Sequence, residues 1–427
     1  MKVEVVQGVC PASTGNYDFT GTSPAGDMVG AIFFIGGAAA NDVNTGSMRW
    51  GIGATDLSSS IFCSQGAQDA TAGAGVRSML STTNCLGCSN GTGGNAAPVG
   101  AYSATLSNGV RLTTSSVNAN RLTNCLLISG TDVSMKVGTQ LFATTDTSKT
   151  ITHGLGGTPD LIILMCSFGQ SVSETAGTGV SLGFWDRTTT NQSSVSWRAT
   201  TGANPTDIAS YASTTHSGQI LAAASVSADV TLTSIGSTQF TITLSSAGDS
   251  TSKYFGWIAL RGTTQLFTKN ILTAIPTSTG NAAIIAGMTG RPQAYIAIPT
   301  RLVVADTIKA DDTAGSYGTC VGATNNYSTT TQGSNEVNFT DGATPNSVAR
   351  NFISITKGIL SQATDGSADV AGTVNSWDTG GVTVNYTNVG ASLRQMAVLA
   401  FGAQAPSLPV FIPRRTLRPV NTIYYPR

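Results

Sequence analysis

Residues 238–244 read TQFTITL, and this short stretch shows the pattern on which the fold prediction depends. Phe240, Ile242 and Leu244 alternate with polar residues, so in an extended chain the apolar side chains share one face. Residues 382–386 (VTVNY) alternate in the same way. A period of two with β-branched and aromatic residues predicts strands that have one face in a core and one face in water.

Longer apolar runs predict strands that are covered on both faces. They are Val29–Gly37 (VGAIFFIGG), Leu161–Gly169 (LIILMCSFG) and Gln293–Thr300 (QAYIAIPT), and each begins 132 residues after the one before. Downstream, WGIGATD at Trp50–Asp56 is matched by SLGFWDRT at 181–188 and by TCVGATN at 319–325. Landmarks that recur in one order at a fixed period predict tandem copies of one unit.

Each copy also closes in a similar way, with an alternating strand and then an apolar strand that ends at Gly130, Gly262 or Gly402. We therefore expect an all-β chain of three tandem β-sandwich or jelly-roll-like units, with roughly seven or eight short strands in each. The expected domains are residues 1–135, 136–264 and 265–403, followed by an extended arm at 404–427.

The joints between the expected units are short. Gly130–Thr150 leads into the second unit and Gly262–Thr279 leads into the third, and neither segment is rich in proline. Neighbouring units should therefore pack against each other. Helix content should be very low, although residues 346–357 are left open.

Composition narrows the class of protein. The 427 residues are enough for two to four domains, and 40% of them are hydrophobic. Only 10% are charged, with a formal net charge of zero, so nothing favours direct binding to nucleic acid or to an anionic membrane. The N-terminal residues have no apolar core of the kind a secretory signal needs, so we expect none there, and no apolar run approaches the ~20 residues of a membrane span. We expect synthesis in the cytoplasm and no membrane partner.

The last residues differ from the rest of the chain. After Gly402 they read AQAPSLPVFIPRRTLRPVNTIYYPR, with prolines, arginines and no acidic residue. Proline at this density favours an extended course. A disordered tail is one interpretation, but the many apolar groups favour an arm that docks on a neighbouring subunit or partner. The predicted partner-binding residues are Leu408, Phe411, Ile412, Arg414, Arg415, Arg418, Tyr424 and Tyr425.

The sequence contains few groups that could carry out catalysis. The two histidines are His153, which we expect to hold its own turn by a hydrogen bond, and His216 in a loop. There is no HExxH, GxSxG or Walker motif. Asp311 and Asp312 form an adjacent acid pair that fits a solvated loop better than a calcium site. We expect no enzyme activity, no cofactor and no bound metal.

Cysteines and tryptophans leave a few alternatives open. Cys125 and Cys166 are expected to be buried thiols, whereas Cys85 and Cys88 form a CxxC pair that could also hold a local disulfide or a metal. Among the tryptophans, Trp50, Trp185 and Trp257 are expected in cores. Trp197 and Trp377 are the two that would be tested for contact with a glycan.

The turn TSKTITHGLGGTP at residues 147–159, followed by PDLIILMCSFG, resembles the modules of tailed-bacteriophage virion proteins. The closing strands YFGWIALRG and QMAVLAFGA extend the resemblance to all three units but not to the arm. The resemblance implies a structural virion component: a tail, collar, fibre or capsid decoration protein that contacts other virion proteins and forms a homo-oligomer. The alternative is a receptor-binding or glycan-binding adhesin module that recognises the host surface. An enzyme acting on polysaccharide would need two facing carboxylates, and nothing in the sequence selects such a pair.

Overall fold

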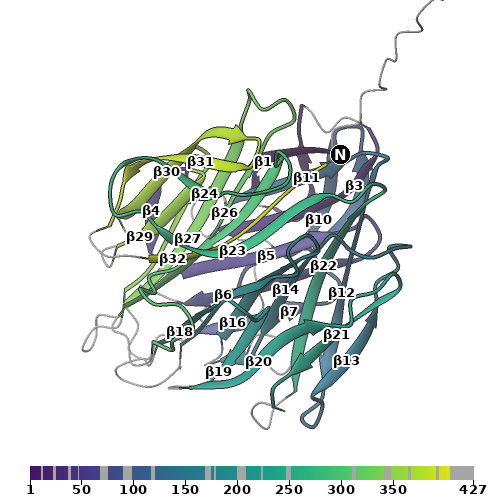
Figure 1. The fold of residues 1–427 in the computed structure, drawn as a ribbon, viewed down its shortest axis with the longest axis horizontal. Helices are drawn as coiled ribbons and strands as arrows, with labels where there is room; N and C mark the ends of the chain where they lie inside the picture. The colour runs from purple at the N-terminus through teal and green to yellow at the C-terminus, as the bar shows by residue number, and fades with distance from the viewer. Residues whose placement is uncertain are drawn as a thin grey trace, which may run out of the picture.

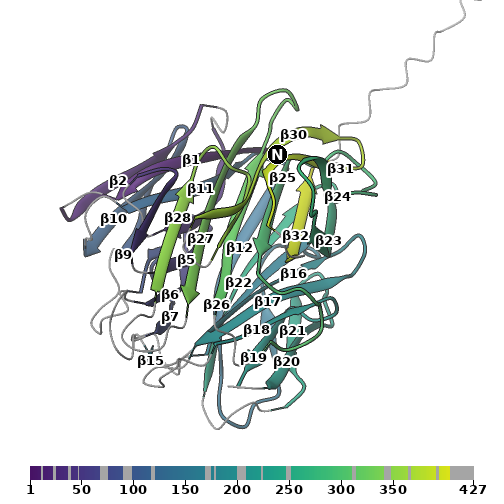
Figure 2. The ribbon, with the colours of Figure 1, turned by 90° about the vertical axis from the view of Figure 1, so that its left-hand side faces the viewer.

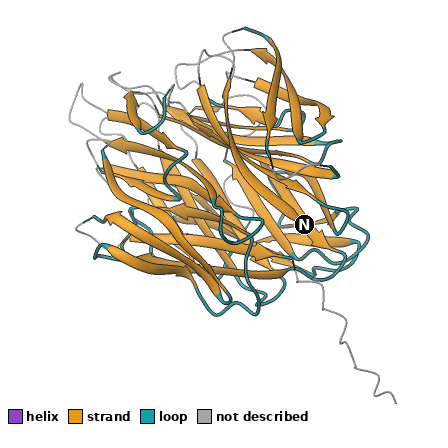
Figure 3. Ribbon diagram, turned by 90° about the horizontal axis from the view of Figure 1, so that it is seen from above, coloured by secondary structure: helices purple, strands orange, loops and turns teal. Residues whose placement is uncertain are grey.

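The computed structural model describes residues 1–10, 13–22, 26–36, 40–46, 48–67, 76–89, 99–116, 121–168, 175–176, 179–199, 208–222, 225–246, 252–309, 314–340, 348–363, 367–390 and 394–403. All regular structure in these residues is β-strand, and no helix occurs among them (Figures 1 and 3). The prediction of an all-β protein is confirmed. The stretch 346–357, left open above, contains the strand β28 (Val348–Ser354).

The first third of the chain forms two packed antiparallel sheets. The large sheet has the order β1-β11-β3-β5-β6-β7-β15, and the small sheet has the order β2-β10-β9-β8. The strands of this third are β1 (Lys2–Cys10), β2 (Gly15–Thr20), β3 (Met28–Gly36), β4 (Val43–Gly46), β5 (Met48–Thr55), β6 (Ser60–Ala67), β7 (Arg77–Ser81), β8 (Leu86–Gly87), β9 (Val99–Leu106), β10 (Gly109–Ser116) and β11 (Arg121–Ser129).

The middle third has a large sheet of order β12-β22-β14-β16-β17-β18 and a small sheet of order β13-β21-β20-β19. Its strands are β12 (Val133–Phe142), β13 (Ser148–Thr152), β14 (Leu161–Ser167), β15 (Thr175–Ala176), β16 (Gly179–Asp186), β17 (Gln192–Ala199), β18 (Ile208–Ser213), β19 (Gly218–Leu221), β20 (Val226–Thr233), β21 (Gln239–Leu244) and β22 (Lys253–Gly262).

The last third has a large sheet of order β23-β32-β25-β26-β27-β28-β4 and a small sheet of order β24-β31-β30-β29. Its strands are β23 (Phe267–Ile275), β24 (Gly280–Ile285), β25 (Ala294–Pro299), β26 (Ala314–Ala323), β27 (Thr331–Thr340), β28 (Val348–Ser354), β29 (Ile359–Gln362), β30 (Ala368–Asp378), β31 (Gly381–Asn388) and β32 (Arg394–Gly402).

The strand order is the same in the three sheet pairs. In each large sheet the first strand of the third lies at one edge and pairs with the last strand, which pairs in turn with the third strand in chain order. Leaving aside β4 and β15, six strands of the large sheet and four of the small sheet follow this pattern, more than the roughly seven or eight strands expected per unit. The alternating TQFTITL stretch is β21, with Phe240, Ile242 and Leu244 buried.

The segments expected to be joints are strands in part. The boundary predicted between residues 135 and 136 falls inside β12, and β23 lies within Gly262–Thr279. An edge strand buries only part of one face: Val133, Met135, Val137 and Phe142 are buried, while the stretch from Gly138 to Leu141 is more exposed. Its polar half therefore resembles a linker in sequence, which explains the error.

The apolar side chains form separate cores inside the sandwiches and a shared core between them. Each sandwich has its own cluster between its two sheets, which includes Phe33, Phe240 or Tyr386. The largest cluster contains residues from the large sheets of all three thirds, such as Ile32 and Ile163. The three large sheets therefore surround one interior, and no third of the chain completes its core alone.

One aromatic side chain from each third meets in this shared core. Trp50, Trp197 and Tyr317 are each at most 2% exposed. The ring of Tyr317 lies 5.2 Å from that of Trp50 and 5.0 Å from that of Trp197. The Tyr317 hydroxyl also donates a hydrogen bond to Gln65, in the first third. Aromatic pairs at this spacing contribute about 0.5–1.5 kcal/mol beyond their buried area, so this contact joins the three sandwiches.

Short segments cross between neighbouring thirds at the far edge of each large sheet. From the first third, β4 pairs with β28. From the middle third, β15 pairs with β7 (Figure 2). From the last third, Lys309 forms a bridge with Ser210 at β18. Each third therefore adds a segment to the sheet edge of another, and the exchange closes in a ring. Covered edges remove the unpaired backbone groups that promote pairing between chains.

Candidate functional site

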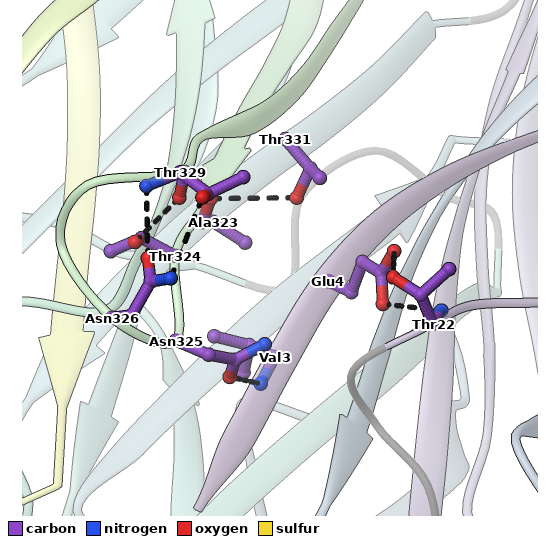
Figure 4. Close-up of a pocket in the computed structure, with 9 residues that line it drawn as sticks. All are labelled: Val3, Glu4, Thr22, Ala323, Thr324, Asn325, Asn326, Thr329 and Thr331. Atoms are coloured by element: carbon purple, nitrogen blue, oxygen red, sulfur yellow. Dashed lines mark hydrogen bonds between the residues drawn. The ribbon is translucent and has the colours of Figure 1, made fainter.

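A pocket of about 270 Å³ lies where β1 meets the hairpin loop between β26 and β27. The first and the last thirds of the chain form it together. In Figure 4, Glu4 and Thr22 lie on one side, and the residues of the loop lie on the other. The described residues that line it are Val3, Glu4, Thr22, Ala323, Thr324, Asn325, Asn326, Thr329 and Thr331. We call it the junction pocket.

The loop wall of the junction pocket is held by local hydrogen bonds. The Asn326 side-chain oxygen accepts from the backbone N–H groups of Ser328 and Thr329, at 3.1 and 2.8 Å. The Thr324 hydroxyl accepts from the Tyr327 N–H at 2.8 Å and donates to the Thr329 carbonyl at 2.7 Å. Asn and Thr side chains commonly stabilise turns in this way. These contacts position the loop before any ligand arrives.

Two side chains of the same hairpin cap the outer edge of β1. The Val3 N–H donates to the side-chain oxygen of Asn325 at 2.7 Å, and the Val5 N–H donates to the Thr331 hydroxyl at 2.8 Å. Backbone N–H groups at a sheet edge need such partners when water is excluded. The capping bonds fix the distance between β1 and the loop, and with it the width of the pocket.

Glu4 is the charged residue of the junction pocket. It lies on β1 between the two capped valines and is 8% exposed. Its carboxylate oxygens accept from the Thr22 N–H at 2.9 Å and from the Thr22 hydroxyl at 3.1 Å. No other described lining residue carries a charge. The pocket therefore presents one oriented carboxylate beside an amide and several hydroxyls.

This set of groups suits binding better than catalysis. The described lining residues include no histidine, cysteine or lysine that could act as a base or nucleophile beside Glu4. Hydrolysis of a glycosidic bond commonly uses two carboxylates, and the described lining holds one.

Two other pockets are smaller. One, of about 180 Å³, is lined by Thr188, Gln265, Leu266, Phe267 and Thr289, where β23 meets the loop after β16. The second, of about 160 Å³, is mostly apolar and is lined by Leu302, Val303, Val304, Thr307, Ile308 and Lys309.

A serine, a histidine and an aspartate come together in the middle third, but not in a catalytic arrangement. The Nδ1 atom of His216 lies 3.2 Å from the Ser213 hydroxyl and 3.7 Å from the Asp229 carboxylate. A catalytic triad needs the serine and the acid on different ring nitrogens, and here both face Nδ1. Ser213 is buried, and its hydroxyl also accepts from the Thr215 N–H at 3.2 Å. The cluster holds the loop between β18 and β19.

His153 holds its own turn, as the sequence predicts. Its Nδ1 accepts from the Leu155 N–H at 3.2 Å, and its Nε2 lies 3.2 Å from the Gly236 carbonyl oxygen. The ring is 2% exposed and stacks over Phe240. Burial lowers the pKa of His153, although the Gly236 carbonyl acts against this shift. The contacts favour the neutral ring with its proton on Nε2.

Trp197 and Trp377, the two tryptophans left to test for contact with a glycan, are buried in the structure. Each is 1% exposed. Trp197 belongs to the shared core, and the Trp377 indole N–H donates to the Thr330 hydroxyl at 2.9 Å. Trp50, Trp185 and Trp257 are buried, as predicted. Neither candidate offers an exposed face for stacking on a sugar.

All seven cysteines are buried and none forms a disulfide bond; burial was predicted for Cys125 and Cys166. Burial raises the pKa of Cys85 to about 12, and Cys88, the second cysteine of the CxxC pair, is also fully buried. A buried thiol with a raised pKa is a weak nucleophile and a weak ligand.

Several predicted residues fall outside the described part of the chain. The arm residues Leu408, Phe411, Ile412, Arg414, Arg415, Arg418, Tyr424 and Tyr425 lie there, as do Asp311 and Asp312. Within the described residues, no three His, Cys, Asp or Glu side chains are grouped so that they could hold a metal ion. The same residues include no helix with the length and apolar character needed to cross a bilayer.

Comparison with protein-family models, with curated proteins and with solved structures found no match for this chain.

The junction pocket was not predicted from the sequence. Glu4 is an isolated acid near the N-terminus, and Asn325 closes the recurring hairpin motif that ends in GATD at Asp56 and in GATN at Asn325. That recurrence was used only to align the copies. The Asn at the end of this motif, where the first copy has Asp, could have pointed to the pocket, because a polar side chain at a hairpin tip often forms hydrogen bonds to the backbone.

Proposed function

We propose that the protein is a non-enzymatic structural component on the exterior of a phage virion, in the tail, collar, fibre or capsid decoration. In this proposal the arm at residues 404–427 attaches it to other virion proteins. The three sandwiches form the exposed body.

The observation that carries the proposal is the closed exchange of edge segments among the three large sheets. β4, β15 and the Ser210–Lys309 bridge cover one edge of each sheet with a neighbouring third. A subunit on the outside of a particle stands at high local concentration beside its copies, where open edges would pair. The shared core also couples the three sandwiches, so that local opening is opposed by all of them.

Other features support a structural role. The cysteines are buried, which protects them from oxidation outside the cell. The surface depends on hydroxyl and amide groups more than on charge, since 10% of the residues are charged. The described lining of the junction pocket holds one carboxylate, Glu4, and no histidine, cysteine or lysine.

The adhesin alternative loses the support of its two candidate sugar-stacking residues. It needs an exposed aromatic platform or an acidic metal loop, and its two tryptophan candidates, Trp197 and Trp377, are buried.

Deleting Ala405–Arg427 tests the proposal. We expect the truncated protein to keep a cooperative unfolding transition, because the described core ends before this segment. It should be missing from particles purified from the producing cells, as measured by mass spectrometry. The double variant Phe411→Ala, Tyr424→Ala should reduce incorporation, since aromatic anchors commonly carry interface energy. Normal incorporation of the truncated protein would refute attachment through the arm, and absence of the full-length protein from particles would refute the virion assignment.

A further inference from the structure

Two arginine side chains of the first sandwich lie on the same face of its large sheet. Arg49 on β5 is opposite Gly66 on β6, and Gly66 is opposite Arg77 on β7. Residues that lie directly opposite each other in a sheet share a face, so the two arginines flank the glycine. A side chain added at Gly66 would meet the carbonyl oxygen of Ser89, which follows β8 of the small sheet. Both arginines therefore project toward the inside of the sandwich.

The buried nitrogens of these arginines have no hydrogen-bond partner in the chain. They are the Nε and Nη1 atoms of Arg49 and the Nε atom of Arg77. Ser64, two residues before Gly66 on the same face of β6, is 0% exposed, and its hydroxyl is also without a partner. Within the part of the chain that the structure describes, neither arginine takes part in a salt bridge. Buried donors are nearly always bonded in folded proteins, so this group of donors points to an acceptor from outside the chain.

A third arginine adds to the positive charge at this place. Arg121 begins β11, and it is on the same face of that strand as Cys125 and Leu127, which belong to the core of the first sandwich. Burial lowers the pKa of Arg121, and the nearby guanidinium of Arg49 lowers it further. Like charges repel each other more strongly where water is excluded. Water can accept from the donors, but only an anion also offsets their charge.

The last third has acids where the first third has none. Arg394 begins β32, the strand that corresponds to β11, and it forms an ion pair with Asp369 on β30. With the copies aligned on GATD and GATN, Glu336 on β27 occupies the position of Gly66 on β6. The strand that corresponds to β30 is β9, which reads VGAYSATL and contains no acidic residue. The first sandwich therefore keeps the basic side chains of this cluster and lacks both of these acids.

The arrangement of the donors narrows the class of anion. The two guanidinium groups come from strands on either side of β6, and the Ser64 hydroxyl comes from β6 itself. Guanidinium groups bind oxyanions through several N–H donors at once. A tetrahedral oxyanion accepts from several directions, whereas the two oxygens of a carboxylate lie in one plane with its carbon. The Ser89 carbonyl covers Gly66 between the arginines, which excludes a ligand as large as a nucleotide.

We propose that Arg49, Arg77 and the Ser64 hydroxyl bind a small tetrahedral oxyanion, inorganic phosphate or sulfate, inside this end of the first sandwich. The proposal rests on the unpartnered donors and on the comparison between the thirds, and it does not depend on the proposed virion role.

The test is isothermal titration calorimetry of the full-length protein with sodium phosphate and, separately, with sodium sulfate. Sodium chloride holds the ionic strength constant, because these anions also stabilise proteins without binding to a site. We expect saturable binding at one site, and the anion that binds more tightly is the ligand. Sodium acetate should bind at least about tenfold more weakly, because its carboxylate has only two oxygens in one plane.

Four variants make the result specific to this place. Arg49→Gln and Arg77→Gln should each weaken binding at least about tenfold, since each removes a charge-assisted hydrogen bond. Ser64→Ala should weaken it at least about fivefold. Arg111→Gln removes the same charge from an exposed residue of this sandwich that pairs with Asp18, and it should leave binding unchanged.

Stability without the anion gives a second measurement. In chloride buffer, Arg49→Gln should resist urea at least as well as the native protein, because it removes a partly buried charge that has no partner. Lower stability of Arg49→Gln in that buffer would show that the guanidinium has a structural role instead. The proposal would also be overturned by the absence of saturable binding to either anion, by native-like binding in both arginine variants, or by acetate binding as tightly as phosphate and sulfate.

Discussion

Removing the Asp186 carboxylate should weaken the junction between the middle and last thirds. Asp186 is fully buried and accepts from the Asn270 N–H at 3.1 Å, from the Thr189 N–H at 2.8 Å and from the Thr268 hydroxyl at 3.4 Å. Asp186→Ala leaves the buried Asn270 N–H without this acceptor. Thr189 is partly exposed, and water can replace the lost partner there.

The magnitude follows from these contacts. A buried donor that loses its acceptor costs about 1–3 kcal/mol. Burial raises the pKa of Asp186, although hydrogen bonds from Thr189 and Asn270 act against the shift, so removing the carboxylate also relieves a desolvation cost. We expect a net loss of about 2 kcal/mol for Asp186→Ala. Asp186→Asn, which retains one acceptor oxygen, should lose about 1 kcal/mol.

Urea unfolding measures the loss of stability, and hydrogen exchange locates it. The amide of Asn270 should exchange faster in Asp186→Ala, while amides in β1 and β12 should be protected as in the native protein. The control is Asp378→Ala, on an exposed residue whose carboxylate accepts from the hydroxyls of Ser376 and Thr383, and it should stay within about 0.5 kcal/mol of the native protein. An equally small effect of Asp186→Ala, or uniform loss of protection, would refute the view that the carboxylate acts as an edge cap.

Two further predictions concern pH and have opposite signs. Burial raises the pKa of Glu336 well above its usual range, so the folded state holds a proton that the unfolded state has released, and its contribution to stability falls as pH rises above about 4.3. Glu336→Gln should therefore lose less stability than the native protein as pH rises above about 5, by up to about 1.4 kcal/mol per pH unit in urea unfolding; an unchanged slope would contradict burial of a neutral acid. The pKa of His153 is lowered, so stability falls as pH drops below about 6.5, because the unfolded state takes up the proton first. His153→Asn should be less sensitive to acid in this range, and an identical acid midpoint would show that the Leu155 N–H does not depend on a neutral ring.

Strands could be predicted from the sequence where the hydrophobic pattern matches the burial of the strand's two faces. β21 alternates because one face contacts the small core beneath it, and β14 is apolar throughout because both faces are covered. The edge strands β12 and β23 were missed, because an edge strand buries one face for only part of its length. The period of the pattern weakens where the burial that causes it is incomplete.

The contacts between thirds could not be derived from local pattern. Trp197 was considered for ligand contact because neither an apolar run nor a matching position in another copy placed it in a core. In the structure it faces the shared core, while Ser194 and Ser196, on the opposite face of β17, face the core of their own sandwich. The Ser194 hydroxyl donates to Gln219 at 3.0 Å, which explains how a polar residue is tolerated there. Only the placement of three sheets around one interior makes both faces of β17 buried.

Because the three sandwiches are covalently linked, the contacts between them can differ from one another, which is not possible in a symmetric trimer of identical chains. In such a trimer the contacts at β1, β12 and β23 would be identical, so each of the three strands would carry the same charged residue. In this chain Lys136 pairs with Asp56, Lys269 donates to the Ala286 carbonyl, and Glu4 accepts from Thr22. Because the three sandwiches belong to one chain, each of these strands can be held by a different set of polar contacts.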